Sequence, residues 1–101
     1  MPKTRVAFIG AGSLANAVHY PSVTSLPDVE VAAIAELNPE RAQKTAEKYG
    51  LARTFSDYKE MLAEVDPQAV YCIMPPQFLF EPVTYVLQQG RAVFDWIYRA
   101  G

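Results

Sequence analysis

The chain contains very few of the residues that build metal centres, disulfides and acid–base sites. Among its 101 residues there is one cysteine, Cys72, and one histidine, His19. A single cysteine forms neither an intrachain disulfide nor a cysteine-rich zinc site, and no basic residue near Cys72 in the sequence would stabilise its thiolate. His19 has no second ionisable group at a supporting spacing. We therefore expect a protein of the reducing cytoplasm with no metal site and no catalytic residue.

Excess positive charge and long hydrophobic runs are also missing. Nine Lys and Arg residues against eleven Asp and Glu residues give a net charge of −2, which leaves no basic surface for a nucleic acid backbone. The first apolar run, residues 6–9, is too short for a signal-peptide core or a membrane span. Half of the residues are hydrophobic, enough for one modest core. We expect one domain over residues 1–101, with neither nucleic acid nor membrane as a partner.

Short apolar runs alternate with helical segments along the chain. The runs at residues 6–9 and 69–73 are typical of strands buried on both faces of a sheet, and further strands are expected at residues 29–35, 52–55 and 92–94. Helices are expected between them, at residues 13–25, at 39–49, after Asp57 and at 77–89. Such alternation is typical of right-handed crossovers and a parallel sheet. We predict a Rossmann-type α/β fold with strand order 3-2-1-4-5 and helices on both faces.

Two of these helices carry boundary signals. Asn38 is a favoured N-cap residue, Pro39 suits the first helical position, and Gly50 is expected to end that helix. Asp57 and Glu60 stand at capping-box spacing before the next helix. Both helices therefore have defined starts.

A glycine-rich turn follows the first apolar run. Residues 10–15 read Gly-Ala-Gly-Ser-Leu-Ala, which matches the G-x-G-x-x-G/A fingerprint in its required place between a strand and a helix. In that fingerprint Gly10 permits the tight turn, and Gly12 leaves room for a pyrophosphate. The amides of Ser13 and Leu14 then point at phosphate from the positive end of the helix. The sequence thus predicts a dinucleotide site. The alternative is that the glycines only form a tight turn and bind no ligand.

The acidic residue Glu36 stands at the end of the second run. It follows Gly10 by 26 positions (36 − 10), against the roughly 20 expected between the fingerprint and the ribose-binding acid. A carboxylate there accepts both ribose hydroxyls and repels a 2′-phosphate, which favours NAD over NADP. Arg41 lies one helical turn further on and would suit that phosphate, so NADP stays as the alternative. A solvated loop carboxylate is the other interpretation of Glu36.

These residues, together with Asn-Pro-Glu-Arg-Ala at 38–42 and Met-Pro-Pro at 74–76, resemble the N-terminal domain of the Gfo/Idh/MocA oxidoreductase family. The resemblance runs from about Thr4 to Phe94. It implies an NAD(P)-binding domain of a sugar or cyclitol oxidoreductase. It also implies that the backbone of Met74 and Pro75 lies along the nicotinamide ribose.

The chain departs from the family pattern in its last third. Leu79 and Ala92 replace two family histidines, and the Glu-Lys-Pro motif expected after Phe94 is absent. The sequence diverges from about Asp95, which we expect to end the fifth strand, with Tyr98 in a frayed tail. The resemblance therefore implies that the chain keeps the cofactor half of the enzyme and lacks the catalytic half.

Two functional interpretations follow. The first is a cofactor-binding domain that is not catalytic alone. The alternative is a non-enzymatic dinucleotide-sensing or scaffold module, or an inactive fragment. Residues 96–98 and an uncovered sheet edge are candidates for self-association, unless these side chains fold back over the fifth strand.

Overall fold

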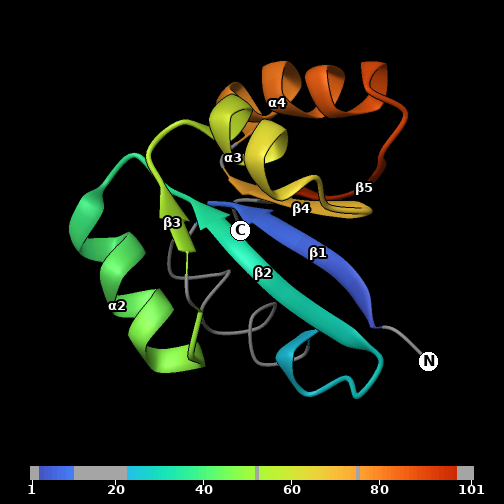
Figure 1. The fold of residues 1–101 in the computed structure, drawn as a ribbon. Helices are drawn as coiled ribbons and strands as arrows, with labels where there is room; N and C mark the ends of the chain where they lie inside the picture. The colour runs from blue at the N-terminus through green and yellow to red at the C-terminus, as the bar shows by residue number, and fades with distance from the viewer. Residues whose placement is uncertain (1–2, 11–22, 52, 75, 98–101) are drawn as a thin grey trace.

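Five parallel strands form a single sheet in the order β3-β2-β1-β4-β5 (Figure 1), which confirms the predicted order. The computed structural model describes residues 3–10, 23–51, 53–74 and 76–97. Its strands are β1 Thr4–Ile9, β2 Val29–Ala35, β3 Arg53–Phe55, β4 Ala69–Met74 and β5 Ala92–Ile97. The helices described are α2 Pro39–Tyr49, α3 Tyr58–Val65 and α4 Pro76–Gln88.

The predicted elements agree with the structure to within a residue or two, except at β5. Strand β4 runs one residue further than predicted, and α4 begins and ends one residue earlier. Of the predicted helix 13–25 only the end is described, where residues 23 and 24 are helical. Ala52, which we expected to open the third strand, lies outside the described residues.

The prediction that Asp95 ends the fifth strand is wrong. Strand β5 continues to Ile97, with Asp95 paired to Cys72 and Ile97 paired to Met74 in unbroken parallel register with β4. The backbone ladder along β4 outweighs the low strand preference of a single aspartate, because pairing and packing override local propensity.

Helices cover both faces of the sheet, and each face has its own core. On the α2 side the buried cluster includes Phe8, Ile34 and Ala42, and the rings of Phe8 and Tyr71 stack with centroids 4.9 Å apart. The other face is covered by α3 and α4 (Figure 1). There Met61 and Leu62 of α3 and Val86 of α4 pack on small strand residues, including Ala7, Ala33 and Cys72. Strand β1, in the middle, is therefore buried from both sides.

Strand β2 contains a bulge in its pairing with β1. Val6 pairs with Val31 but the next residue, Ala7, pairs with Ala33, so that Ala32 is an extra residue. Side chains alternate between the faces of a regular strand, and the extra residue resets that alternation. Val29 and Val31 pack on the α2 side, whereas Ala33 and Ala35 pack on the α3 and α4 side.

The predicted caps are present. The side chain of Asn38 accepts hydrogen bonds from the first turn of α2, Pro39 opens the helix, and Gly50 ends it with φ 69°. The side chain of Asp57 accepts from the amide of Lys59 at the start of α3. The sequence did not indicate that Asp66, with φ 49°, ends α3 in the left-handed conformation.

Candidate functional site

The carboxyl ends of β1, β2 and β4 meet at one edge of the sheet, next to the point where the strand order reverses (Figure 1). In open parallel sheets this is where ligands bind. Gly10 directly follows β1, Glu36 directly follows β2, and Met74 is the last residue of β4. The structure thus brings three of the predicted site residues to one edge.

Gly10 occupies a position that only glycine fits. Its φ is 104°, and a Cβ built on it would collide with the backbone carbonyl oxygen of Ile73 in β4. Its amide donates to the carbonyl oxygen of Ala35, at 2.9 Å. The backbone of Gly10 therefore lies in close contact with the ends of both strands that neighbour β1, as expected of the first glycine of the fingerprint.

Glu36 is half-buried and held at both its backbone and its side chain. Its amide donates to the carbonyl oxygen of Phe55 in β3, at 2.8 Å. One carboxylate oxygen, Oε2, accepts from the amide of Asn38, at 2.9 Å. Its neighbour Ala35 is bonded to Gly10, so the backbone of Glu36 directly follows the strand end that contacts Gly10.

The other predicted site residues are less closely tied to this edge. Arg41 lies in the first turn of α2, where its side chain is exposed and its amide donates to Oδ1 of Asn38, at 3.3 Å. Gly12, Ser13, Leu14 and Pro75 lie outside the described residues, so their roles stay predictions.

Three exposed apolar side chains that follow β2 and β4 in the sequence were not predicted as part of the site. Leu37, directly after Glu36, is 86% exposed, and Phe78 and Phe80 at the start of α4 are 63% and 81% exposed. A leucine inside a polar turn was the available signal for the first. The exposure of the phenylalanines depends on how α4 packs, which the sequence pattern does not reveal.

Among the residues that the structure describes, no three His, Cys, Asp or Glu side chains are grouped so that they could hold a metal ion. Nor is any helix there long and apolar enough to cross a membrane. What the carboxyl edge offers is a close-approach glycine turn and one fixed carboxylate.

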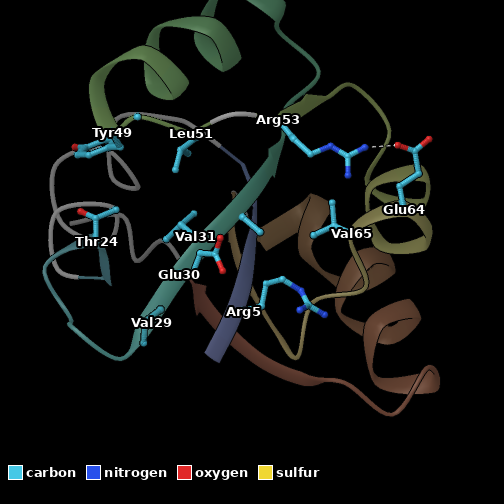
Figure 2. Close-up of a pocket in the computed structure, with 12 residues that line it drawn as sticks. Arg5, Thr24, Val29, Glu30, Val31, Tyr49, Leu51, Arg53, Glu64 and Val65 are labelled. Carbon is cyan, nitrogen blue, oxygen red and sulfur yellow. Dashed lines mark hydrogen bonds and ion pairs between the residues drawn. The ribbon is translucent and has the colours of Figure 1, made fainter. Parts of the chain in front are cut away.

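A pocket in the described part of the chain lies away from this edge. Figure 2 shows a pocket of about 490 Å³ at the amino end of the strands, lined by the first half of β2 and by the carboxyl ends of α2 and α3. It exists because β3 pairs only with residues 33–35 of β2. On its rim, Arg53 forms an ion pair with Glu64, at 2.6 Å. This pocket is separate from the predicted dinucleotide edge.

The sheet order, the glycine turn after β1 and the acid after β2 define a Rossmann-type nucleotide-binding domain. Residues 4–95 match the GFO_IDH_MocA family, described as an oxidoreductase family with an NAD-binding Rossmann fold. The chain therefore belongs to the Gfo/Idh/MocA oxidoreductase family.

Its relatives are dehydrogenases and reductases. The chain is 37% identical over 86 residues to D-glucoside 3-dehydrogenase of Escherichia coli strain K12, a match that covers 85% of this chain and 24% of the relative. The WlbA dehydrogenase from Bordetella pertussis, solved with NADH and UDP-GlcNAcA, is 26% identical with a TM-score of 0.84, covering 92% of this chain and 29% of that one.

A mutant of a 3-ketoreductase from Actinomadura kijaniata, solved with TDP-benzene and NADP, is 29% identical with a TM-score of 0.83. The match covers 94% of this chain and 30% of that one. The chain thus spans 24% to 30% of the length of these relatives. Both forms of the cofactor occur among them.

Proposed function

We propose that this chain binds NAD(H) across the carboxyl edge of its sheet, as the cofactor domain of an oxidoreductase acting on sugar or cyclitol hydroxyl groups. The observation that carries the proposal is Gly10, whose φ and closeness to Ile73 admit no side chain and whose amide donates to Ala35, the residue before Glu36. Family membership supports the same ligand class.

In this proposal the pyrophosphate binds after Gly10, where the fingerprint continues through Gly12 to Ser13 and Leu14. A residue without a side chain at position 12 lets the backbone approach the phosphates. Amides at the start of the following helix, with the helix dipole, contribute roughly 0.3–1 kcal/mol of attraction for the negative charge.

The adenosine ribose is assigned to Glu36. A carboxylate at the end of the second strand accepts hydrogen bonds from both ribose hydroxyls and repels a phosphate in their place. Arg41 is the residue that would favour NADP, but its side chain is exposed and no described contact directs it toward Glu36. We therefore propose NAD, with NADP as the weaker ligand.

The nicotinamide end is assigned to the backbone of Met74 and Pro75, after β4. Bound NAD supplies a hydride acceptor there. Hydride transfer also requires a substrate held within about 3.5 Å of the nicotinamide. We propose that residues 1–101 bind the cofactor without turning over a substrate, because no acid–base pair is assigned to this edge.

A reducing, cytoplasmic location is part of the proposal. Cys72, the one cysteine, is fully buried in the core cluster that α3 and α4 cover. A buried cysteine of this kind acts as a small hydrophobic residue. This use of cysteine is typical of proteins that need no disulfide.

A second candidate function is a module that senses a dinucleotide and associates with itself. It is favoured by the outer side of α4, where Phe80 and Leu87 are 81% and 57% exposed and stand seven residues apart. That spacing places both on one side of a helix. Residues 96–98 and the sheet edge are the other proposed contacts.

The test is calorimetric titration of the chain with NADH and NADPH, with its mass in solution measured with and without ligand. Saturable binding that prefers NADH supports the cofactor domain, and a ligand-dependent change of mass supports the sensing module. A folded chain that binds neither dinucleotide contradicts both and identifies an inactive fragment. Gly12→Val is the matched variant, because it fills the space proposed for the pyrophosphate.

A further inference from the structure

We propose that Asn38 is a specificity-determining positioning residue: it holds the carboxylate of Glu36 and occupies the amides at the start of α2, so that the site prefers NAD to NADP. The inference rests on the proposed function and extends it to a residue that does not itself touch the ribose. It is carried by the hydrogen bonds of residues 36–42.

The first step is the position of the carboxylate. Glu36 is anchored by its own amide to Phe55, and Oε2 of its side chain accepts the amide of Asn38, at 2.9 Å. The side chain therefore bends toward the start of α2. Its negative charge lies where the positive end of a helix stabilises it.

The second step is the double use of Asn38. While its amide donates to Glu36, its side-chain Oδ1 accepts from the amides of Glu40 and Arg41, at 3.0 and 3.3 Å. Its carbonyl oxygen accepts from the amide of Ala42, at 3.1 Å. One residue thus joins the proposed ribose ligand to the first turn of the helix.

Every backbone amide at the start of α2 has a hydrogen-bond partner. The amides of residues 38, 40, 41 and 42 all have the partners just described, and residue 39 is a proline, which has no amide hydrogen. A helix N-terminus attracts phosphate through amides that lack intrahelical partners. Here those amides are already used by Glu36 and Asn38.

The consequence concerns the 2′-phosphate of NADP, which would lie beside the ribose hydroxyls. It would meet the charge of Glu36 and no spare amide from α2, leaving the exposed Arg41 side chain as its main attraction. Binding NADP therefore requires Glu36 to move and Asn38 to release the helix. Asn38 sets the preference because it resists both changes.

The experiment compares the NADH and NADPH affinities of the chain with those of Asn38→Ala. Loss of the side chain frees the amides of Glu40 and Arg41 and loosens the turn that holds Glu36. The ratio of the two affinities should fall about fivefold toward NADPH, which is the size of effect expected for one or two hydrogen bonds. Asn38→Ser keeps a capping oxygen and should restore the parent ratio.

Gly50→Ala is the matched control for destabilisation of the same helix. Gly50 has φ 69° and open space around its Cβ position, so alanine strains the far end of α2 without a clash. It should lower the melting temperature as Asn38→Ala does, yet leave the ratio of affinities unchanged. An equal fall of the ratio in Gly50→Ala would overturn the proposal, as would an unchanged ratio in Asn38→Ala.

Asn38→Asp provides a test that does not depend on weakening the helix. Aspartate keeps the cap and adds a negative charge beside the proposed phosphate position, so NADPH binding should weaken about threefold while NADH binding stays the same. If NADPH binds as before, Asn38 is not near the phosphate and the proposal fails. A parent chain that binds neither dinucleotide identifies instead a failure of the proposed function.

Discussion

The helix ends at the two edges of the sheet bind different kinds of partner. At the amino edge, where helices end, two arginines donate hydrogen bonds to carbonyl groups at the end of α3. Arg5 donates to the carbonyl oxygen of Asp66, at 2.7 Å. Arg91 donates to those of Pro67 and Leu62, at 2.8 and 3.3 Å, and pairs with the Asp66 carboxylate, at 2.6 Å.

At the carboxyl edge, where helices begin, the partners are a glycine turn and the polar side chains of Glu36 and Asn38. The positive ends of helices face this edge, and the negative ends face the other. The pocket in Figure 2 lies at the amino edge, the edge at which Arg5 and Arg91 bind the end of α3. The proposed ligand edge is marked by close backbone contacts instead.

Gly10→Ala should have the largest effect, because it breaks the carboxyl edge itself. The new Cβ would collide with the carbonyl of Ile73, and φ 104° strains any residue with a side chain. We expect a loss of about 3 kcal/mol or more in the free energy of unfolding. Urea denaturation measures it. A variant of parent stability would show that β1 and β4 do not approach as described.

Arg91→Ala tests the amino edge and should cost about 2 kcal/mol, because it removes the charged donor to the carbonyl oxygens of the buried residues Pro67 and Leu62. The Arg91 side chain is only 16% exposed. The NADH affinity should stay the same in the folded variant. The control is Arg53→Ala, whose ion pair with Glu64 is nearly half exposed, and which should cost less than about 1 kcal/mol. If Arg91→Ala and Arg53→Ala lowered the free energy of unfolding equally, the Arg91 contacts would contribute no more than an exposed ion pair.

Glu36→Ser should affect the ligand edge alone. Removing the carboxylate takes away the proposed acceptor for the ribose hydroxyls and the repulsion of a 2′-phosphate. NADH should bind about tenfold more weakly, as expected for a hydrogen bond to a charged group. Its advantage over NADPH should narrow at the same time. Titration with both cofactors measures the change, and an unaltered ratio would argue against contact between Glu36 and the ribose.

The smallest expected effect is a change in the pH dependence of stability, caused by Asp66 at the amino edge. The hydrogen bond from Arg91, followed by its positive charge, lowers the pKa of Asp66 below its ordinary value of 3.8. A depressed pKa in the folded state stabilises the protein above the ordinary value, and this contribution disappears as the pH falls through the folded-state pKa. Stability measured from pH 5 downward should therefore fall less steeply in Asp66→Asn than in the parent. If the stability of the parent and of Asp66→Asn changed equally with pH, Asp66 would not contribute to the pH dependence.

Most of the fold follows from local pattern. The apolar runs and the signals at Asn38, Pro39 and Gly50 were sufficient to predict the order of the sheet and the limits of α2. The extension of β5 past Asp95 was not predictable, because it depends on pairing with β4 over a long sequence separation. The left-handed cap at Asp66 depends likewise on the distant Arg91.

The candidate site was predicted in part. Gly10, Glu36 and Met74 do meet at one edge, because the ends of parallel strands must do so. The bond between Glu36 and Asn38 was not foreseen, since both residues were interpreted separately, one as a ligand and one as a cap. Whether a ligand residue and a helix cap two positions apart form a hydrogen bond depends on the local path of the backbone.

The bulge at Ala32 decides which side of the molecule carries the acid. In an unbroken strand, Val29, Val31, Ala33 and Ala35 would all face α2, and Glu36 would point toward α3 and α4. The extra residue reverses this parity after Val31. Glu36 thereby reaches Asn38. A β2 of the same length that paired with β1 in regular register throughout would keep every functional side chain in the sequence and turn the acid to the wrong side of the sheet.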